Sequence, residues 1–323
     1  MLHSTLFTQT MSLGRKLLVL TFLAAFTADI YAQEVNADGT ITYYISSPRF
    51  ARPLVERWIK EYAKVRPDVH LSVRKGCSNK HNNMQVVTRR GINDGRSVMY
   101  FGEYAILPVT THGSEACKIL GNKTLSTERM RAIFFDKSPE DYDNAEDMEI
   151  DARSPMKKIV VYSGNDTSSV SSLFAAFYGE QMSRLRGRRI SGDDAFLLNA
   201  IDADPLGVTF NALPNIYDLK ARKLRQNLSL LRMGTSSNVE DVIRNDATLD
   251  EVIEALEQGG TEDIPTASIG VAFDSSNFIA KEFLYWIITS GVKYNHQYGI
   301  LMLDNQVAAQ QVSKVNNRDS AQK

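Results

Sequence analysis

The sequence has few of the residues that mark a disulfide-rich or metal-binding protein. It contains only two cysteines, Cys77 and Cys117, in 323 residues, which is too few for a disulfide framework. Their spacing is equally compatible with one disulfide bond and with two unpaired thiols. There is no C-x-x-C motif, and the five histidines are scattered, so no zinc-binding spacing is present. We therefore expect no metal and no cofactor.

The sequence also has almost no net charge. Lys and Arg together number 37 and Asp and Glu 38, which gives a formal net charge of −1. This balance argues against a nucleic-acid partner and against a membrane surface bound through bulk electrostatics. Beyond the N-terminal segment, no apolar run is long enough to span a bilayer.

The first 32 residues are typical of a secretory signal peptide. Two basic residues precede an apolar run over residues 17–26, and small residues follow, with Ala28 and Ala32 as candidate cleavage sites. Met11 is an alternative start, because it gives a more usual charged segment before the apolar run. We expect residues 1–32 to be removed and the mature chain to be exported to the periplasm.

The rest of the chain is organised around residues 41–62. Residues 41–45 alternate and are rich in β-branched and aromatic side chains, which predicts a strand. Ser46 and Ser47 then form a turn with Pro48 and are two candidate N-caps. From Pro53 onward, apolar residues recur on one helical face. A helix that starts after a polar turn offers unpaired N–H groups to an anion, although most such turns bind nothing.

A second strand, turn and helix occur in the other half of the chain. Residues 158–162 read as a strand, and residues 163–169 form a turn dense in hydroxyl and amide groups. Apolar residues then recur at helical spacing from Val170. Ser168 or Ser169 is placed to cap this helix and to donate to a bound oxyanion. If the two turns face each other across a cleft, two positive helix ends meet one anion.

The remaining periodic segments continue the alternation of strands and helices. We expect strands over residues 69–73, 84–87, 97–109 and 267–273, a turn into a strand over 204–210, and helices over 125–135, 193–201 and 250–256. Ser126 or Thr127 is the expected N-cap of the first of these helices. Ser275 or Ser276 is expected to open a long last helix that ends at Gly291. We interpret residues 140–151 as an exposed acidic loop, the arginines of residues 184–189 as a solvated surface, and the end of the chain beyond Val312 as frayed. The alternation predicts an α/β protein with mainly parallel sheets.

The order and spacing of six segments within residues 40–303 resemble the phosphate-binding periplasmic proteins of ABC transporters. The segments are SSPRFARPLVERWIKEY, YFGEYAILPV, LSTERMRAIFF, IVVYSGNDTSSVSSLF, DADPLGVTFNAL and FLYWIITSGVKYNHQYGILML. The resemblance implies a two-lobed fold of the type 2 periplasmic-binding-protein class, each lobe a mixed sheet flanked by helices, with a ligand cleft between the lobes and closure by a hinge. Residues 40–109 and 263–312 would form lobe 1, residues 110–262 lobe 2, and residues 313–323 a flexible tail.

The resemblance also implies a ligand site made of N–H and hydroxyl groups at helix starts. It assigns ligand contacts to Ser46, Ser47, Arg49, Phe50, Asn83, Asn165, Ser168 and Ser169. The sequence departs from the family pattern in both turns and at Asn83, and in the second turn Ser168, Ser169 and Val170 replace a Ser-Gly-Thr triplet. Arg49 and its neighbours replace a turn usually rich in Gly, Ser and Thr, Asn165 stands near an arginine position, and Asn83 stands near a carboxylate that accepts a proton from hydrogen phosphate. Arg49 would supply the missing positive charge, because a guanidinium suits oxyanions.

Three functions are compatible with these features. The leading one is a monomeric, non-catalytic protein that captures phosphate or a related small oxyanion for ABC-type import, with the transporter permease as its partner. The second is a binding-protein fold that has lost its ligand and acts as an envelope interaction or sensor subunit, which the altered turns favour. The third, an exported hydrolase, is disfavoured because there is no G-x-S-x-G motif and no histidine in a turn beside a candidate serine.

Overall fold

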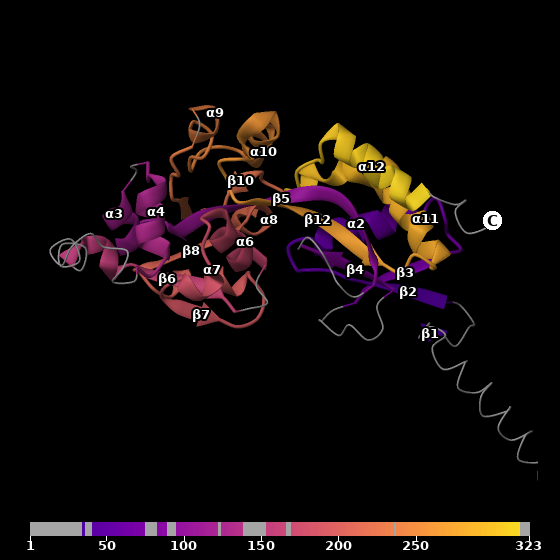
Figure 1. Ribbon diagram of the computed structural model, residues 1–323, viewed down its shortest axis with the longest axis horizontal. Coiled ribbons are helices and arrows are strands. Elements are labelled where there is room, and N and C mark those ends of the chain that lie inside the picture. The colour runs from indigo at the N-terminus through magenta and orange to yellow at the C-terminus, as the bar shows by residue number, and fades with distance from the viewer. Residues whose placement is uncertain are drawn as a thin grey trace, which may run out of the picture. The chain divides into compact units, whose positions relative to one another are not determined.

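The computed structural model of the protein describes residues 34–35, 41–74, 83–88, 95–121, 124–137, 153–165, 169–235 and 237–316 (Figure 1). By its internal contacts the chain divides into two units, residues 1–42 and 43–323. In the first unit, strand β1 (Glu34–Val35) pairs antiparallel with Ile41 and Thr42 at the start of β2 (Ile41–Ser46). All that follows concerns the second unit.

The second unit is built on a mixed sheet. Its strands lie in the order β2, β4 (Met84–Val87), β12 (Thr266–Phe273), β5 (Ser97–Thr111), β8 (Gly207–Ala212), β6 (Val160–Gly164) and β7 (Arg188–Ile190). In addition, β3 (His70–Arg74) pairs with β2, and β11 (Leu228–Leu230) pairs with β5. A separate hairpin joins β9 (Tyr217–Asp218) to β10 (Lys223–Leu224).

Strand β5 belongs to both parts of this sheet. It pairs antiparallel with β12 from Ser97 to Ala105 and with β8 from Ile106 to Thr110. We call β2, β3, β4, β12 and β5 up to Ala105 the first half of the sheet. The second half consists of β5 from Ile106 onward with β11, β8, β6 and β7.

The prediction of mainly parallel sheets is wrong. The pairs β2/β4, β6/β7 and β6/β8 are parallel, whereas β12/β4, β12/β5, β5/β8 and β11/β5 are antiparallel. Alternation of strands and helices favours parallel pairing only when each helix returns the chain to the neighbouring strand. Here β5 and β12 are far apart in the sequence and run in opposite directions, so the sheet is mixed, as the family resemblance implied.

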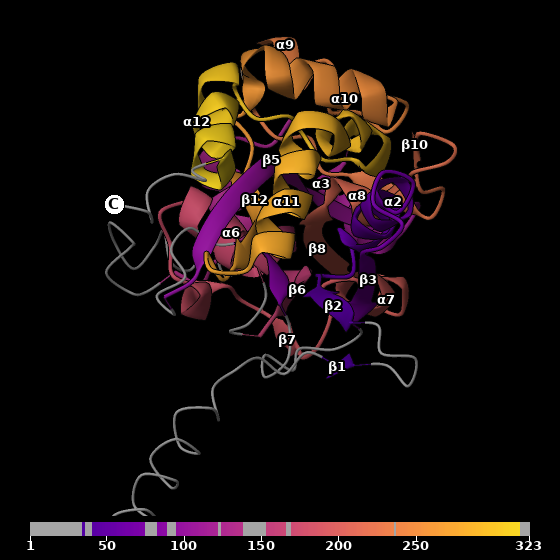
Figure 2. The same ribbon diagram turned by 90° about the vertical axis from the view of Figure 1, so that its right-hand side faces the viewer.

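The helices flank this sheet. In chain order they are α2 (Arg52–Tyr62), α3 (Glu115–Leu120), α4 (Thr127–Phe134), α6 (Ser169–Phe177), α7 (Phe196–Asp202), α8 (Leu213–Ile216), α9 (Ser237–Glu240), α10 (Leu249–Ala255), α11 (Phe278–Trp286) and α12 (Asn305–Asn316). Contacts join α12 to both α11 and β5, which lie beside it in Figure 2. No helix among the described residues is long and apolar enough to cross a bilayer.

The predicted cap of α4 is confirmed, whereas the predicted cap of α11 is wrong. Ser126 caps α4 by accepting the amide of Arg129 at 3.4 Å, as expected. The cap of α11 is Asn277, whose side chain accepts the amide of Ala280 at 3.0 Å, and not Ser275 or Ser276. Ser276 instead donates to the Asp274 carboxylate at 2.8 Å, in a turn that precedes the helix. Three adjacent cap-forming residues cannot be ranked from composition alone.

The C-terminal region differs from the expectation that α11 is the last helix. Beyond Gly291 the chain makes two short 3₁₀ turns, Val292–Tyr294 and His296–Tyr298, and then forms α12. Gln311 and Val315 of α12 are buried, so the helix does not fray at Val312. The side-chain oxygen of Gln311 accepts the amide of Tyr100 on β5 at 3.1 Å. Because Gln311 is polar, a pattern of apolar residues in the sequence does not show that this position is buried against β5.

The prediction of a solvated surface for the arginines of residues 184–189 is confirmed for Arg188 and Arg189, which are exposed, and is wrong for Arg186. Arg186 is only 8% exposed and donates to the carbonyls of Ala132, Met156 and Ile159 at 3.3, 2.9 and 2.7 Å. Its guanidinium therefore bonds to three carbonyls from two other segments, which offsets the cost of burying the charge. Cys117 is a half-buried free thiol. The acidic stretch 140–151 and Cys77 lie outside the described residues.

Candidate functional site

The first predicted turn, between β2 and α2, is closed on its own backbone. Ser46 ends β2 and is 7% exposed, while the Ser47 hydroxyl donates to the carbonyl of Pro48 at 3.0 Å. The amides of Ala51 and Arg52 donate to the same carbonyl at 3.2 and 3.1 Å. Helix α2 begins after Ala51 with no side-chain cap, so neither serine acts as the predicted N-cap.

The helix start is therefore poor in free donors. The amides of Ala51 and Arg52 are already engaged, and Pro53, in the first turn of α2, has no N–H at all. An anion bound at this helix end would therefore have to be contacted by groups other than the backbone nitrogens of residues 51–53. Arg49, which is exposed in the preceding turn, brings a positive charge to this helix end.

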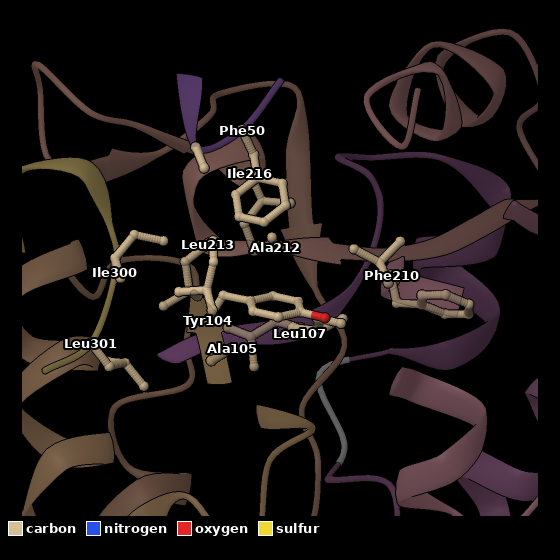
Figure 3. Close-up of a cluster of buried hydrophobic side chains, with 14 of the residues drawn as sticks. Phe50, Tyr104, Ala105, Leu107, Phe210, Ala212, Leu213, Ile216, Ile300 and Leu301 are labelled. Atoms are coloured by element: carbon tan, nitrogen blue, oxygen red, sulfur yellow. The ribbon is translucent and has the colours of Figure 1, made fainter. Parts of the chain in front are cut away.

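Phe50, unlike the exposed Arg49, is buried: it is only 5% exposed. Its ring centroid lies 5.5 Å from that of Tyr104 on β5. Figure 3 shows Phe50 in one buried cluster with Tyr104 and with Leu213 and Ile216 of α8. The ring thus belongs to a hydrophobic core that joins β5 to α8, and it anchors the segment that carries Arg49.

Asn83 is held by a backbone contact. Its side-chain oxygen accepts the amide of Tyr44 at 2.8 Å, next to the parallel pairing of Ile45 with Met84. The residue therefore fixes β2 against the start of β4. An amide in this position has no carboxylate with which to accept a proton from a ligand.

The second predicted turn, between β6 and α6, is described only in part. Ser168 lies outside the described residues, and the amide of Asn165 donates to the carbonyl of Ile190 at 3.2 Å. Ser169 is the first residue of α6, and its hydroxyl donates to the Asp194 carboxylate at 3.4 Å, a long hydrogen bond. A carboxylate thus lies at this helix start, where the helix dipole favours negative charge.

Buried polar side chains support this second turn, and sequence reasoning missed them. The Ser171 hydroxyl accepts the amide of Gly164 at 2.8 Å. Asn211, fully buried on β8, accepts from the amide group of Asn215 at 2.7 Å and donates to the backbone carbonyl of Asp194 at 2.6 Å. These bonds fix the segment that carries Asp194. The sequence feature that could have indicated them is the pair Thr209 and Asn211, two polar residues on one face of an otherwise apolar strand.

A charged cluster lies on the same half of the sheet. The Tyr162 hydroxyl donates to the Asp204 carboxylate at 2.9 Å, and Arg188 donates to that hydroxyl at 3.3 Å. Burial, followed by the hydrogen bond to Asp204, raises the pKa of Tyr162, so the phenol is neutral at physiological pH. Arg189 donates to the buried Ser163 hydroxyl at 2.7 Å. These two arginines therefore already have partners within the second half of the sheet.

The geometry separates the predicted site residues into two groups. Ser46, Ser47 and Phe50 are fixed within the first turn and the adjoining core, with Asn83 holding β2, whereas Arg49 is exposed. Ser169 is bonded to Asp194, and Asn165 to the backbone of Ile190. Each hydrogen bond described above holds a turn to its own half of the sheet. Convergence of the two turns on one ligand stays a prediction.

Solved structures with a similar fold are phosphate-binding proteins of ABC transporters. A protein assigned as a phosphate ABC transporter substrate-binding protein, with bound phosphate, from Clostridium perfringens matches with a TM-score of 0.56 and 13% sequence identity, covering 81% of this chain and 100% of that chain. An ABC-type phosphate transport receptor from Vibrio cholerae matches with a TM-score of 0.51 and 12% identity, over the same 81% and 100%. No protein-family model matches the sequence, and a search of curated proteins finds no match.

These identities are low, so the likeness establishes the fold alone. The chain has the α/β fold of type 2 periplasmic binding proteins, with a mixed sheet flanked by helices. The fold predicted from the sequence resemblance is therefore confirmed. The ligand must be argued from the residues of this chain.

Proposed function

We propose that the protein is a non-catalytic solute-binding protein that captures a small oxyanion, phosphate or a related ion, and delivers it to an ABC-transporter permease. The observation that carries the proposal is the fold, because the two solved structures described above are phosphate-transport proteins and one of them holds phosphate. In open α/β sheets, ligands bind beyond the carboxyl ends of strands, and both predicted turns follow such ends, those of β2 and β6. The signal peptide of residues 1–32 would place the protein in the periplasm.

The proposal includes two lobes that close on the ligand. Residues 40–109 with 263–312 would form one lobe, and residues 110–262 the other. The pairing of β5 supports this division, because β5 leaves β12 at Ala105 and joins β8 at Ile106. A strand shared in this way makes a connection about which two lobes can hinge.

Arg49 and the start of α6 would hold the anion. Arg49 is exposed and its guanidinium offers several donors in a plane, which matches the oxygens of a tetrahedral oxyanion. Ser169 offers a hydroxyl at the positive end of a nine-residue helix. Because residues 51–53 are engaged or lack an N–H, side chains would carry more of the binding than backbone amides on the α2 side.

A second candidate function is a binding-protein fold that has lost its ligand and acts as an envelope interaction or sensor subunit. A specific observation favours it: groups expected to donate to or accept from a ligand have protein partners. The Ser47 hydroxyl bonds to Pro48, the Asn83 oxygen accepts from Tyr44, and the Ser169 hydroxyl bonds to Asp194. A ligand must displace or share these contacts.

Isothermal titration calorimetry with ligand-stripped mature protein tests the proposal. Phosphate, sulfate and arsenate are titrated into the wild type, Arg49→Ala and Arg49→Lys. Loss of a charge-assisted hydrogen bond costs about 1.5–3 kcal/mol, so Arg49→Ala should weaken binding by at least about tenfold, with Arg49→Lys in between. Arg129→Ala, which removes an exposed arginine from α4, is the matched control and should bind as the wild type does. Absence of heat with every anion contradicts the proposal and favours the second function.

A further inference from the structure

A single arginine ties the β9–β10 hairpin to two distant segments. Arg222 lies in the hairpin turn with a φ of 59°, and it is the one non-glycine residue in the described part of the chain with a positive φ. Its guanidinium donates to the Asp250 carboxylate, with a distance of 3.1 Å from Nε, and to the carbonyls of His296 and Gln297 at 2.9 and 3.1 Å. A left-handed backbone conformation is costly for arginine. In this conformation the Nε, Nη1 and Nη2 atoms of Arg222 all donate to protein acceptors.

A second contact joins the same regions. Glu257, in the π-helical segment Leu256–Gly260 that follows α10, accepts from the ring Nε2 of His296 at 2.8 Å. The same carboxylate oxygen accepts the amide of Met302 at 2.6 Å. We call Arg222, Asp250, Glu257 and His296 the clasp. Its contacts fix residues 296–302 at both ends.

The two sides of the clasp are attached to different parts of the sheet. Residues 295–302 are held on the first half: Glu103 of β5 and Leu301 exchange backbone hydrogen bonds of 3.0 and 2.8 Å, and the Asn295 side chain donates to the carbonyl of Phe101 at 2.9 Å. Arg222, Asp250 and Glu257 follow β8 in the chain and belong to the segment proposed as the second lobe. The clasp thus bridges the two proposed lobes.

We propose that the clasp is a pH-sensitive lock, which holds the two lobes together while His296 is protonated and releases them when His296 loses its proton. The inference rests on the proposed lobe division and not on the identity of the ligand. The protonated imidazole and the Glu257 carboxylate form an ion pair, whereas the neutral ring leaves a weaker hydrogen bond in which only the carboxylate is charged. The charged groups that face His296 are Glu257, Arg222 and Asp250.

The direction of the pH response follows from these groups. The hydrogen bond to Glu257 raises the pKa of His296, against the effects of burial and Arg222. Burial tends to raise the pKa of Glu257, but the hydrogen bonds from His296 and the Met302 amide outweigh it and lower the pKa. The locked state is therefore favoured above the lowered pKa of Glu257 and below the raised pKa of His296, and it weakens as pH rises through the latter.

Small-angle X-ray scattering of the mature protein without added anion tests the lock. The radius of gyration is measured at about pH 5.5 and about pH 8.5, on either side of the ordinary histidine pKa. The wild type should be larger at the higher pH. His296→Gln retains a side-chain N–H but cannot titrate, so its radius should not respond to pH. His70→Gln, at an exposed position on β3, is the control and should respond as the wild type does.

Hydrogen exchange at the Met302 amide supplies a second measurement on the same samples. After correction for intrinsic rates, protection in the wild type should be higher at the lower pH and about tenfold lower in Glu257→Gln, which loses a charged acceptor. A wild-type radius that does not change with pH, or a His296→Gln radius that still does, overturns the proposal. Because no anion is present, that result leaves the oxyanion proposal standing, and absence of anion binding leaves the lock standing.

Discussion

Replacing Phe50 with alanine should destabilise the protein by about 3 kcal/mol, the lower end of the range for Phe→Ala in a core. The ring is 5% exposed and packs against Tyr104 at a centroid distance of 5.5 Å. An aromatic pair contributes about 0.5–1.5 kcal/mol beyond the burial of its area. We take the lower end because Phe50 precedes α2 in a turn, which can relax into part of the cavity. For a mature chain of this size the change corresponds to a fall in Tm of about 5 °C.

Urea unfolding followed by tryptophan fluorescence measures this loss, because Trp58 is fully buried on α2 and reports on the core next to the turn. The matched control is Phe278→Ala, which removes a phenylalanine that is 59% exposed on α11 and should change stability by less than about 0.5 kcal/mol. A Phe50→Ala effect as small as the control would show that the ring is not in the core. Phe50 would then be free to line a ligand cleft, and the separation of Phe50 from Arg49 would be wrong.

Three further predictions test the fold and its charge network. Gly187→Ala places a Cβ 2.1 Å from the carbonyl oxygen of Val161 at a φ of +86°, so we expect loss of soluble folded protein; Gly113→Ala, at a φ of +70° with open space around it, should cost only about 1 kcal/mol. Thr248→Ala removes the capping box of α10 and should lower the free energy of unfolding, measured by thermal unfolding, by about 1 kcal/mol, whereas Thr248→Ser keeps the hydroxyl and should be as stable as the wild type. Burial, followed by the charge of Glu282, raises the pKa of Tyr62 from 10.0 to about 12. The phenol of the unfolded chain therefore ionises first, and the stability of the fold falls as the pH rises above 10. Tyr62→Phe should reduce that fall, and a variant whose stability has the same alkaline pH profile as the wild type would contradict the prediction.

Local features of the fold could be predicted from the sequence because they depend on neighbouring residues. The Ser126 cap, the strands at residues 84–87 and 97–109 and the helix from Pro53 each follow from a short pattern of hydroxyl, apolar or proline residues. Strand direction depends on how the chain returns to the sheet, so the antiparallel pairing of β5 with β12 and β8 was not predictable from alternation. The burial of Arg186 depends on carbonyls from two other segments, which no local pattern encodes.

The candidate site was predictable in position but not in hydrogen bonding. The strands predicted to precede the two Ser-rich turns are present as β2 and β6, although Ser163 and Gly164 belong to β6 and not to the turn. The partner of Asn83 is the amide of Tyr44, 39 residues away, and that of Ser169 is Asp194, 25 residues away. Such long-range partners decide whether a donor is free for a ligand. The sequence therefore identifies where an anion could bind and leaves open whether the groups there are available.

The central claim is that a small oxyanion binds between Arg49 and the start of α6. The most direct measurement is a crystal structure of the mature protein grown with tungstate, a tetrahedral oxyanion whose anomalous signal locates it without ambiguity. We expect an anomalous peak within hydrogen-bonding distance of both the Arg49 guanidinium and the Ser169 hydroxyl. A structure with no peak there, and with Ser169 still bonded to Asp194, would contradict it.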